Sequence, residues 1–81
     1  MSNDKIFNQK KCIKNWKRLM LDADISTVQA FSDFCGVSTN ALRNTLSGKS
    51  DPTAETIARI SEAFGISADY VMGLYDDPLP F

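Results

Sequence analysis

Histidine is absent from this chain of 81 residues, and cysteine occurs only twice, at Cys12 and Cys35. With no histidine and no Cys-x-x-Cys pair, the usual ligands of a zinc site cannot be assembled. General acid–base and nucleophilic catalysis lose their usual side chains as well, and no glycine-rich phosphate loop is present. We therefore expect a protein that is not an enzyme and that uses no metal and no cofactor.

Long apolar runs are also missing. No segment approaches the ~18 residues that a membrane-spanning helix requires, and no signal-peptide pattern opens the chain. These observations predict a cytoplasmic protein with no membrane partner. In that setting the two cysteines are interpreted as small buried side chains on helix faces, and a disulfide is the less favoured alternative.

The charge is distributed unevenly along the chain, although the net charge is only −1. Residues 1–22 hold six lysines and arginines against two aspartates, a net charge of +4. Residues 23–50 are neutral, and residues 51–81 hold one arginine against six acidic residues, a net charge of −5. This polarity favours a molecule that meets a polyanion with one face.

The spacing of apolar residues predicts five short helices, with no strand signal and no internal repeat. We expect them over about residues 9–22, 28–35, 38–47, 54–64 and 68–74. Serine or threonine precedes the last four as an N-cap, with Ser26 and Thr27 as alternatives for the second helix, and Gly36 and Gly65 end the second and fourth. Residues 1–9 form an arm or lead-in, residues 10–75 the domain, and residues 76–81 a tail with two prolines.

The predicted helix over residues 38–47 has an outward face without a carboxylate. At 100° per residue, one side of the helix holds Ala41, Leu42, Thr45 and Leu46, and hydroxyl, amide and guanidinium groups turn to the other. Such groups exchange hydrogen bonds with the edges of DNA bases, and arginine can also bind phosphate. An ordinary solvated surface is the alternative interpretation of this helix alone. The outward residues are Thr39, Asn40, Arg43, Asn44 and Ser47.

The segment from Gly36 to Gly73, GVSTNALRNTLSGKSDPTAETIARISEAFGISADYVMG, resembles the phage-repressor-like helix-turn-helix domains. This family includes the Cro and CI repressors and the Xre regulators. The shared features are Gly-Val-Ser, a glycine twelve positions beyond the first, Pro-Thr-x-Glu-Thr, and the ending Ala-Phe-Gly-Ile-Ser with Asp-Tyr. The resemblance covers about residues 10–74. It implies an all-α fold, a compact five-helix lambda-repressor-like bundle whose helices 2 and 3 form the helix-turn-helix.

The resemblance also implies which residues contact DNA. Helix 3 would lie in the major groove, and the residues placed to contact bases are Ser38, Thr39, Asn40, Arg43 and Asn44. Val28 stands where the family often has a phosphate-binding glutamine, so this contact moves to Gln29. Asp51 stands where the family often has a basic residue. The residues expected to contact phosphate are Lys10, Lys14, Lys17, Arg18, Thr27, Gln29, Ser47, Gly48 and Lys49.

The implied function is that of a sequence-specific regulator of transcription, a repressor of phage or mobile-element type, which binds an operator in double-stranded DNA as a homodimer. Helix 5 and the tail carry more apolar residues than so short an end requires. These residues either cover the core of their own domain or form a symmetric dimer patch, and they are Tyr70, Met72, Leu74, Tyr75, Leu79 and Phe81. The alternative function is an antitoxin or antirepressor-like module whose main partner is another protein, which the acidic C-terminal third favours.

Overall fold

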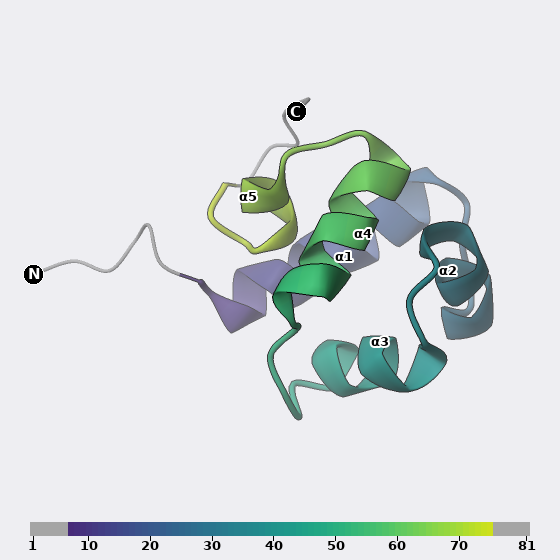
Figure 1. The fold of residues 1–81 in the computed structure, drawn as a ribbon, viewed down its shortest axis with the longest axis horizontal. Helices are drawn as coiled ribbons and strands as arrows, with labels where there is room; N and C mark the ends of the chain where they lie inside the picture. Colours follow the sequence, from purple (N-terminus) through teal and green to yellow (C-terminus); the bar gives the residue numbers. More distant parts are fainter. Residues whose placement is uncertain (1–6, 76–81) are drawn as a thin grey trace, which may run out of the picture.

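Five α-helices account for the regular structure of residues 7–75, the part of the chain that the computed structural model describes (Figure 1). Their bounds are α1 Gln9–Asp22, α2 Val28–Cys35, α3 Thr39–Leu46, α4 Ala54–Phe64 and α5 Ala68–Val71. The all-α prediction is confirmed, and within these residues no strand is present. The fifth helix is shorter than predicted because the backbone turns at Gly73, where φ is +87°.

Each helix begins at a side chain that accepts a hydrogen bond from the third residue of the helix. Ser38 accepts from the Ala41 amide at 3.2 Å and Thr27 from the Ala30 amide at 3.1 Å. Asn8 caps α1 in the same way at 3.0 Å, so the helix starts at Gln9. Phe7, which precedes this cap, packs against the core.

The turns that follow α2 and α4 have the same construction. Gly36 and Gly65 adopt positive φ of +72° and +67°, which a residue with a side chain adopts at a cost. In each turn a serine hydroxyl donates to a carbonyl five residues later at 2.5 Å, from Ser32 to Val37 and from Ser61 to Ile66. The segments SDFCGVS and SEAFGIS, 29 positions apart, thus form one repeated turn that the sequence analysis missed.

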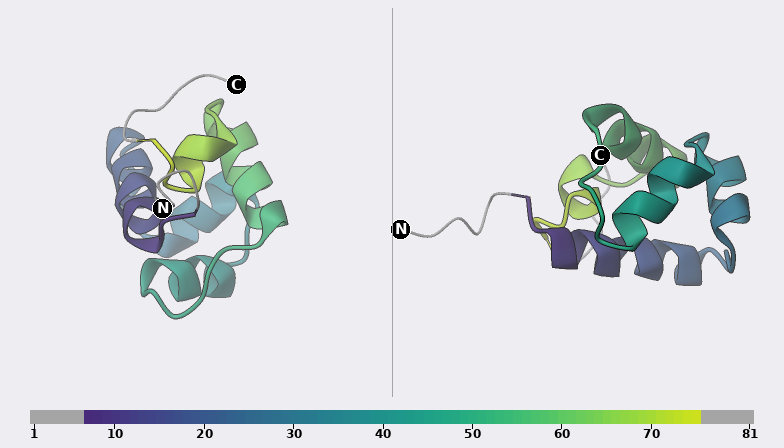
Figure 2. Two further views of the ribbon diagram at one scale, coloured as in Figure 1. Left: turned by 90° about the vertical axis from the view of Figure 1, so that its left-hand side faces the viewer. Right: turned by 90° about the horizontal axis from the view of Figure 1, so that it is seen from below.

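The core lies where α1 crosses behind α4 and meets α2 and α5 (Figures 1 and 2). Trp16 of α1 packs edge-on against Phe31 of α2, with ring centroids 6.0 Å apart, and its indole nitrogen donates to the Val71 carbonyl at 2.9 Å. These contacts make α1 the element that joins the helix-turn-helix to α5. The fully buried hydrophobic residues are Cys12, Trp16, Phe31, Leu42, Ile60, Tyr70 and Val71.

The burial of Tyr70 corrects one part of the predicted dimer patch. Its side chain has no exposed surface, because α5 presses it into the core, so it cannot meet a second copy in this state. Met72 and Leu74 are half-buried, and Tyr75 is 39% exposed. Leu79 and Phe81 lie outside the described residues.

Both cysteines are buried as free thiols, as predicted, and form no disulfide. Cys12 is fully buried, and burial, with a smaller effect of the Asp51 carboxylate, raises the pKa of its thiol to about 12. Burial raises the pKa of the Cys35 thiol as well. Neither thiol is therefore available as a thiolate near neutral pH.

We predict that Gly73→Ala destabilises the protein more than Gly65→Ala. Both glycines have positive φ, so both variants lose about 1 kcal/mol from backbone strain. A Cβ at Gly73 would lie 2.5 Å from the Cys12 amide nitrogen and 2.7 Å from the Asn8 carbonyl oxygen, whereas nothing lies within 4 Å at Gly65. In urea unfolding, the free energy of unfolding of Gly73→Ala should therefore be lower than that of Gly65→Ala by a further ~1–3 kcal/mol. Equal losses would show that α5 shifts away from α1 without cost.

We also predict that the buried thiol makes the stability fall at high pH. Above pH 9 the unfolded state releases the Cys12 proton while the folded state retains it up to about pH 12. The free energy of unfolding should therefore decrease by about 1.4 kcal/mol per pH unit in this range. The free energy of unfolding of wild type and of Cys12→Ala, measured from pH 8 to 11, separates the contribution of Cys12 from that of other titrating groups. Parallel pH profiles of the two proteins would contradict it.

Candidate nucleic-acid interface

One face of α3 is buried and the other is open to solvent. Leu42 is fully buried and Thr45 is 1% exposed, whereas Asn40 and Arg43 are exposed. Thr39 and Asn44 are half-buried at the two margins of the open face. Figure 2 (right), seen from below, shows α3 in front, with α1 alongside. Burial thus fixes the rotation of α3 about its axis and presents the predicted base-contacting side chains outward.

The side-chain amides of Asn40 and Asn44 are open to a ligand. Within residues 7–75, no group donates to or accepts from either amide. The backbone carbonyl of Asn44, by contrast, receives the Lys49 amide at 2.9 Å and the Ser50 amide at 3.2 Å. The backbone of Asn44 therefore holds the loop after α3 in place while its side chain remains free to contact DNA.

A polar hollow of about 240 Å³ lies between α3 and the loop that leads to α4. Asn40 and Asn44 line one side of it, and Ser50, Asp51 and Thr53 line the other. Asp51 places a carboxylate at the edge of a surface that is otherwise neutral or basic. This charge opposes the approach of a phosphate to the hollow.

Gln9 fixes the loop from the opposite side. Its Nε2 donates to the Gly48 carbonyl at 3.3 Å and to Asp51 Oδ1 at 3.2 Å. This contact brings the first turn of α1 next to the loop. The sequence analysis placed Gln9 where the lead-in meets the first helix, and it missed this contact with the loop. The sequence does contain a local signal that α1 begins at Gln9. Asn8 is a suitable helix cap, and Phe7 and Cys12 stand at the two positions that pack together in a hydrophobic staple.

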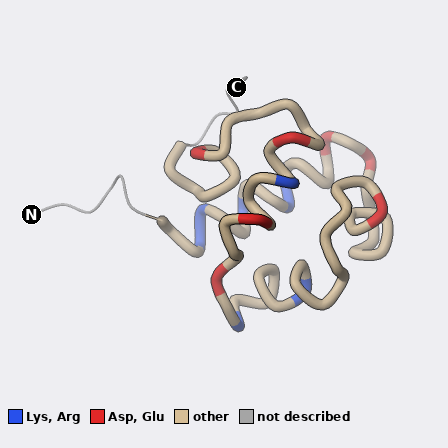
Figure 3. The backbone as a smooth tube through the Cα atoms, in the orientation of Figure 1, with Lys and Arg blue, Asp and Glu red and all other residues tan. Residues whose placement is uncertain are grey.

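The basic residues of α1 divide into two groups. Lys10, Lys14 and Lys17 are exposed along one stripe, next to the stripe of Gln9 and Ile13 that faces the loop. Arg18 lies nine positions after Gln9, about 180° around the helix, and its Nε lies 3.9 Å from Asp22 Oδ2. The structure therefore does not bring Arg18 to α3. Figure 3 shows cations along α1 and at the lower edge, where α3 and its loop lie.

The start of α2 supplies the remaining predicted phosphate contacts. Thr27 is exposed, and its hydroxyl oxygen already caps α2. Gln29 is exposed as well, but its Nε2 donates to Asp33 Oδ1 at 2.9 Å. A phosphate contact by Gln29 thus requires that this bond within α2 is released. Among the first-turn amides of α2, that of Ala30 already donates to the Thr27 hydroxyl oxygen.

A model of the helix-turn-helix family matches residues 17–71, more than half of the chain. The chain belongs to this family. The match confirms the resemblance to the Cro, CI and Xre proteins, and it makes the chain a DNA-binding regulator of transcription. In this helix-turn-helix protein, α2 and α3 are the two helices of the motif, joined at Gly36. No curated protein and no solved structure gives a match to the chain.

Other kinds of site receive no support from the described residues. Between residues 7 and 75, no group of three or more histidine, cysteine or acidic side chains is placed to hold a metal ion. No helix in this range is long and apolar enough to cross a membrane.

We predict that Asp51→Asn strengthens the binding of duplex DNA. The substitution removes one negative charge beside Gly48 and Lys49 and retains an oxygen that can accept from Gln9. Affinity for a random-sequence duplex should rise about threefold at low salt, and the gain should shrink as salt screens the charge. Glu62→Gln, the same charge change on an exposed residue near the far end of α4, is the control. An equal gain from both variants would mean that only net charge matters.

Proposed function

We propose that this helix-turn-helix protein is a repressor of phage or mobile-element type that reads one operator sequence in the major groove with α3. The observation that carries the proposal is the outward face of α3, on which the Asn40, Arg43 and Asn44 side chains stand without a carboxylate. Leu42 and Thr45 anchor the opposite side of the same helix. Repression is the simplest action because occupancy of an operator is sufficient for it.

The dimensions of α3 support insertion into the major groove. A helix of eight residues is about 12 Å long, close to the width of that groove. Asparagine amides pair with the N6 and N7 positions of adenine, and an arginine pairs with O6 and N7 of guanine. Asn40 and Asn44 are one helical turn apart, so they can contact neighbouring base pairs. Ser38 and Thr39, at the start of α3, are the other proposed base contacts.

Phosphate contacts on either side would position α3 without adding sequence information. The proposed set comes from the start of α1, the start of α2 and the loop after α3. Arg18 is left out because of its place on α1. With few cations in the set, each monomer should bind weakly, so two copies on paired half-sites are expected. The proposed residues are Lys10, Lys14, Lys17, Thr27, Gln29, Ser47, Gly48 and Lys49.

One observation favours a second candidate function, a module that binds mainly another protein. Phe34 is 51% exposed and packs on the half-buried Phe64 with ring centroids 4.9 Å apart. Exposed Asp33 precedes Phe34 in α2, and exposed Glu62 lies two positions before Phe64 in α4. An exposed aromatic ring with acidic residues near it in sequence suits a partner of basic and apolar character. Salt-sensitive binding of duplex DNA distinguishes the candidates, because only the DNA reader requires it.

We predict that Asn40→Ala and Asn44→Ala reduce the preference for the operator. Each removes a side-chain contact with a base edge, so each should reduce specific affinity about tenfold and leave affinity for random DNA unchanged. Lys14→Ala should instead weaken both kinds of binding equally and reduce the salt slope by about one. Selection from a random duplex pool supplies the operator, and titration at several salt concentrations gives the affinities. An unaltered sequence preference in both asparagine variants would remove α3 from the reading role.

A further inference from the structure

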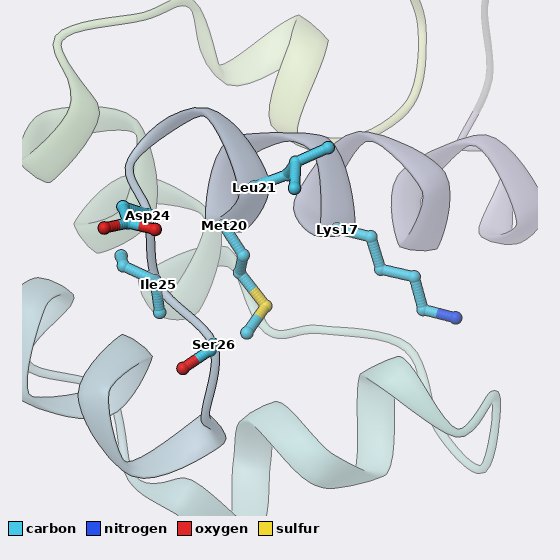
Figure 4. Close-up of a pocket in the computed structure, with 6 residues that line it drawn as sticks. All are labelled: Lys17, Met20, Leu21, Asp24, Ile25 and Ser26. Carbon is cyan, nitrogen blue, oxygen red and sulfur yellow. The ribbon is translucent and has the colours of Figure 1, made fainter.

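An apolar groove lies beside α1, and Lys17 is the one residue of its lining that also belongs to the proposed phosphate contacts (Figure 4). It encloses about 280 Å³ between the last turns of α1 and the loop that leads to α2. Met20, Leu21 and Ile25 form its apolar surface. Figure 4 shows Lys17 at one end of the groove and Asp24 at the other. The groove therefore has a basic end and an acidic end.

The loop keeps this apolar surface open. The Ile25 amide donates to the Met20 carbonyl at 2.7 Å, which folds the loop back against the end of α1. Met20 and Ile25 are half-buried, but Leu21 is 78% exposed, the most exposed large hydrophobic residue among those described. Contact of this apolar side chain with water is unfavourable in free energy, and burial by a partner would remove that contact.

The size and lining of the groove indicate the kind of occupant. Pockets for cofactors and other small molecules usually enclose 300–1,000 Å³ and hold several convergent polar groups. This groove is smaller, and its polar groups are confined to Lys17, Asp24 and Ser26. It suits one or two apolar side chains from a peptide whose charged end is acidic and lies at Lys17.

We propose that the groove binds residues 76–81 of a second copy of this chain, and that the exchange of these segments forms the dimer. Their sequence, DDPLPF, joins two aspartates to Leu79 and Phe81, and these six residues lie outside the described ones. Asp76 and Asp77 would pair with Lys17, and the two apolar residues would cover Leu21 and Ile25. The orientation is set by charge, since the reverse places both aspartates next to Asp24.

The position of Tyr75 favours a second copy over the chain's own tail. Asn15 Nδ2 donates to the Tyr75 carbonyl at 3.0 Å and to the Tyr70 carbonyl at 2.8 Å, so the described chain ends beside Asn15. Lys17 lies two residues further along α1, about 200° around the helix, on nearly the opposite face. The chain's own tail would have to pass around α1, whereas the tail of a second copy would not.

The exchange has the symmetry that a dimeric reader requires. Each copy gives its tail and receives the other, which is an isologous contact of a two-fold dimer. Two prolines in the segment reduce the conformational entropy that binding removes. The exchange also takes Lys17 out of the expected phosphate contacts, because its ammonium group neutralises aspartates of the partner copy.

The first experiment detects the contact directly. Isotopically labelled and unlabelled full-length protein are mixed in equal amounts, and isotope-filtered NOEs are recorded. We expect NOEs between the Leu21 and Ile25 methyl groups of one copy and Leu79 or Phe81 of the other. Contacts within one copy only, or no contact with the tail in a dimeric sample, would overturn the proposal.

The second experiment measures the dimer dissociation constant by sedimentation. Leu21→Ser and Lys17→Glu should each weaken the dimer about tenfold or more, because one removes apolar contact and the other reverses a charge. Combining Lys17→Glu with Asp76→Lys and Asp77→Lys should restore affinity to within about threefold of wild type. Arg59→Glu, the same charge reversal on an exposed residue of α4 outside the groove, is the matched control. A monomeric wild type, or an equal loss from Arg59→Glu and Lys17→Glu, would contradict the exchange.

This inference deepens the dimeric part of the proposed function, and the two can fail separately. If Leu21→Ser does not weaken the dimer, the tail exchange is contradicted and the proposal that α3 reads bases is unaffected. If Asn40→Ala and Asn44→Ala do not change the operator preference, the reading role of α3 is contradicted and the exchange is unaffected.

Discussion

The insertion of Leu42 and Thr45 beneath α3 is the contact on which the rest of the site depends. A helix of eight residues is too short to persist alone in water, so its shape comes from the surface on which it packs. The same two residues fix its rotation, because turning α3 by one position would bury Arg43 or Asn44 without partners. Packing and recognition are therefore two consequences of one arrangement: the side that stabilises α3 determines the side that can contact DNA.

α1 holds this arrangement together at three points. Near its start, Gln9 contacts the loop after α3, through Gly48 and Asp51. Further along, Asn15 and Trp16 bind backbone carbonyls of α5 and of Tyr75, and Gly73 lies directly against its backbone. The element with the highest positive charge is thus also the one that sets the positions of the loop and of the chain after α5. A shift of α1 would move its lysines, the loop after α3 and Tyr75 together.

The parts of the fold that depend on neighbours in sequence could be predicted. Caps such as Thr27 and Ser38, the turn at Gly36 and the buried stripe of α1 follow from local hydrogen bonds and helical spacing. Asn15 and Tyr70 could not be placed in this way. Asn15 is polar yet fully buried, because its partners are carbonyls 55 and 60 positions away. The sequence left Tyr70 open between the core and a dimer patch, and the packing of α5 on α1 places it in the core. The loop contact of Gln9 was missed because its partners lie about 40 positions away.

The separation of charge along the chain is consistent with a weak monomer and a selective dimer. A net charge of −1 gives little general attraction to DNA, and Asp51 opposes it at the edge of the site. On the proposed contacts, a single copy would gain most of its affinity where the lysines of α1 and of the α3 loop meet phosphate together. In the proposed exchange, Asp76 and Asp77 would pair with Lys17 of another copy. If the protein binds an operator with two half-sites as the proposed dimer, only paired copies would bind it tightly, and the low affinity of one copy would then favour the operator over other DNA.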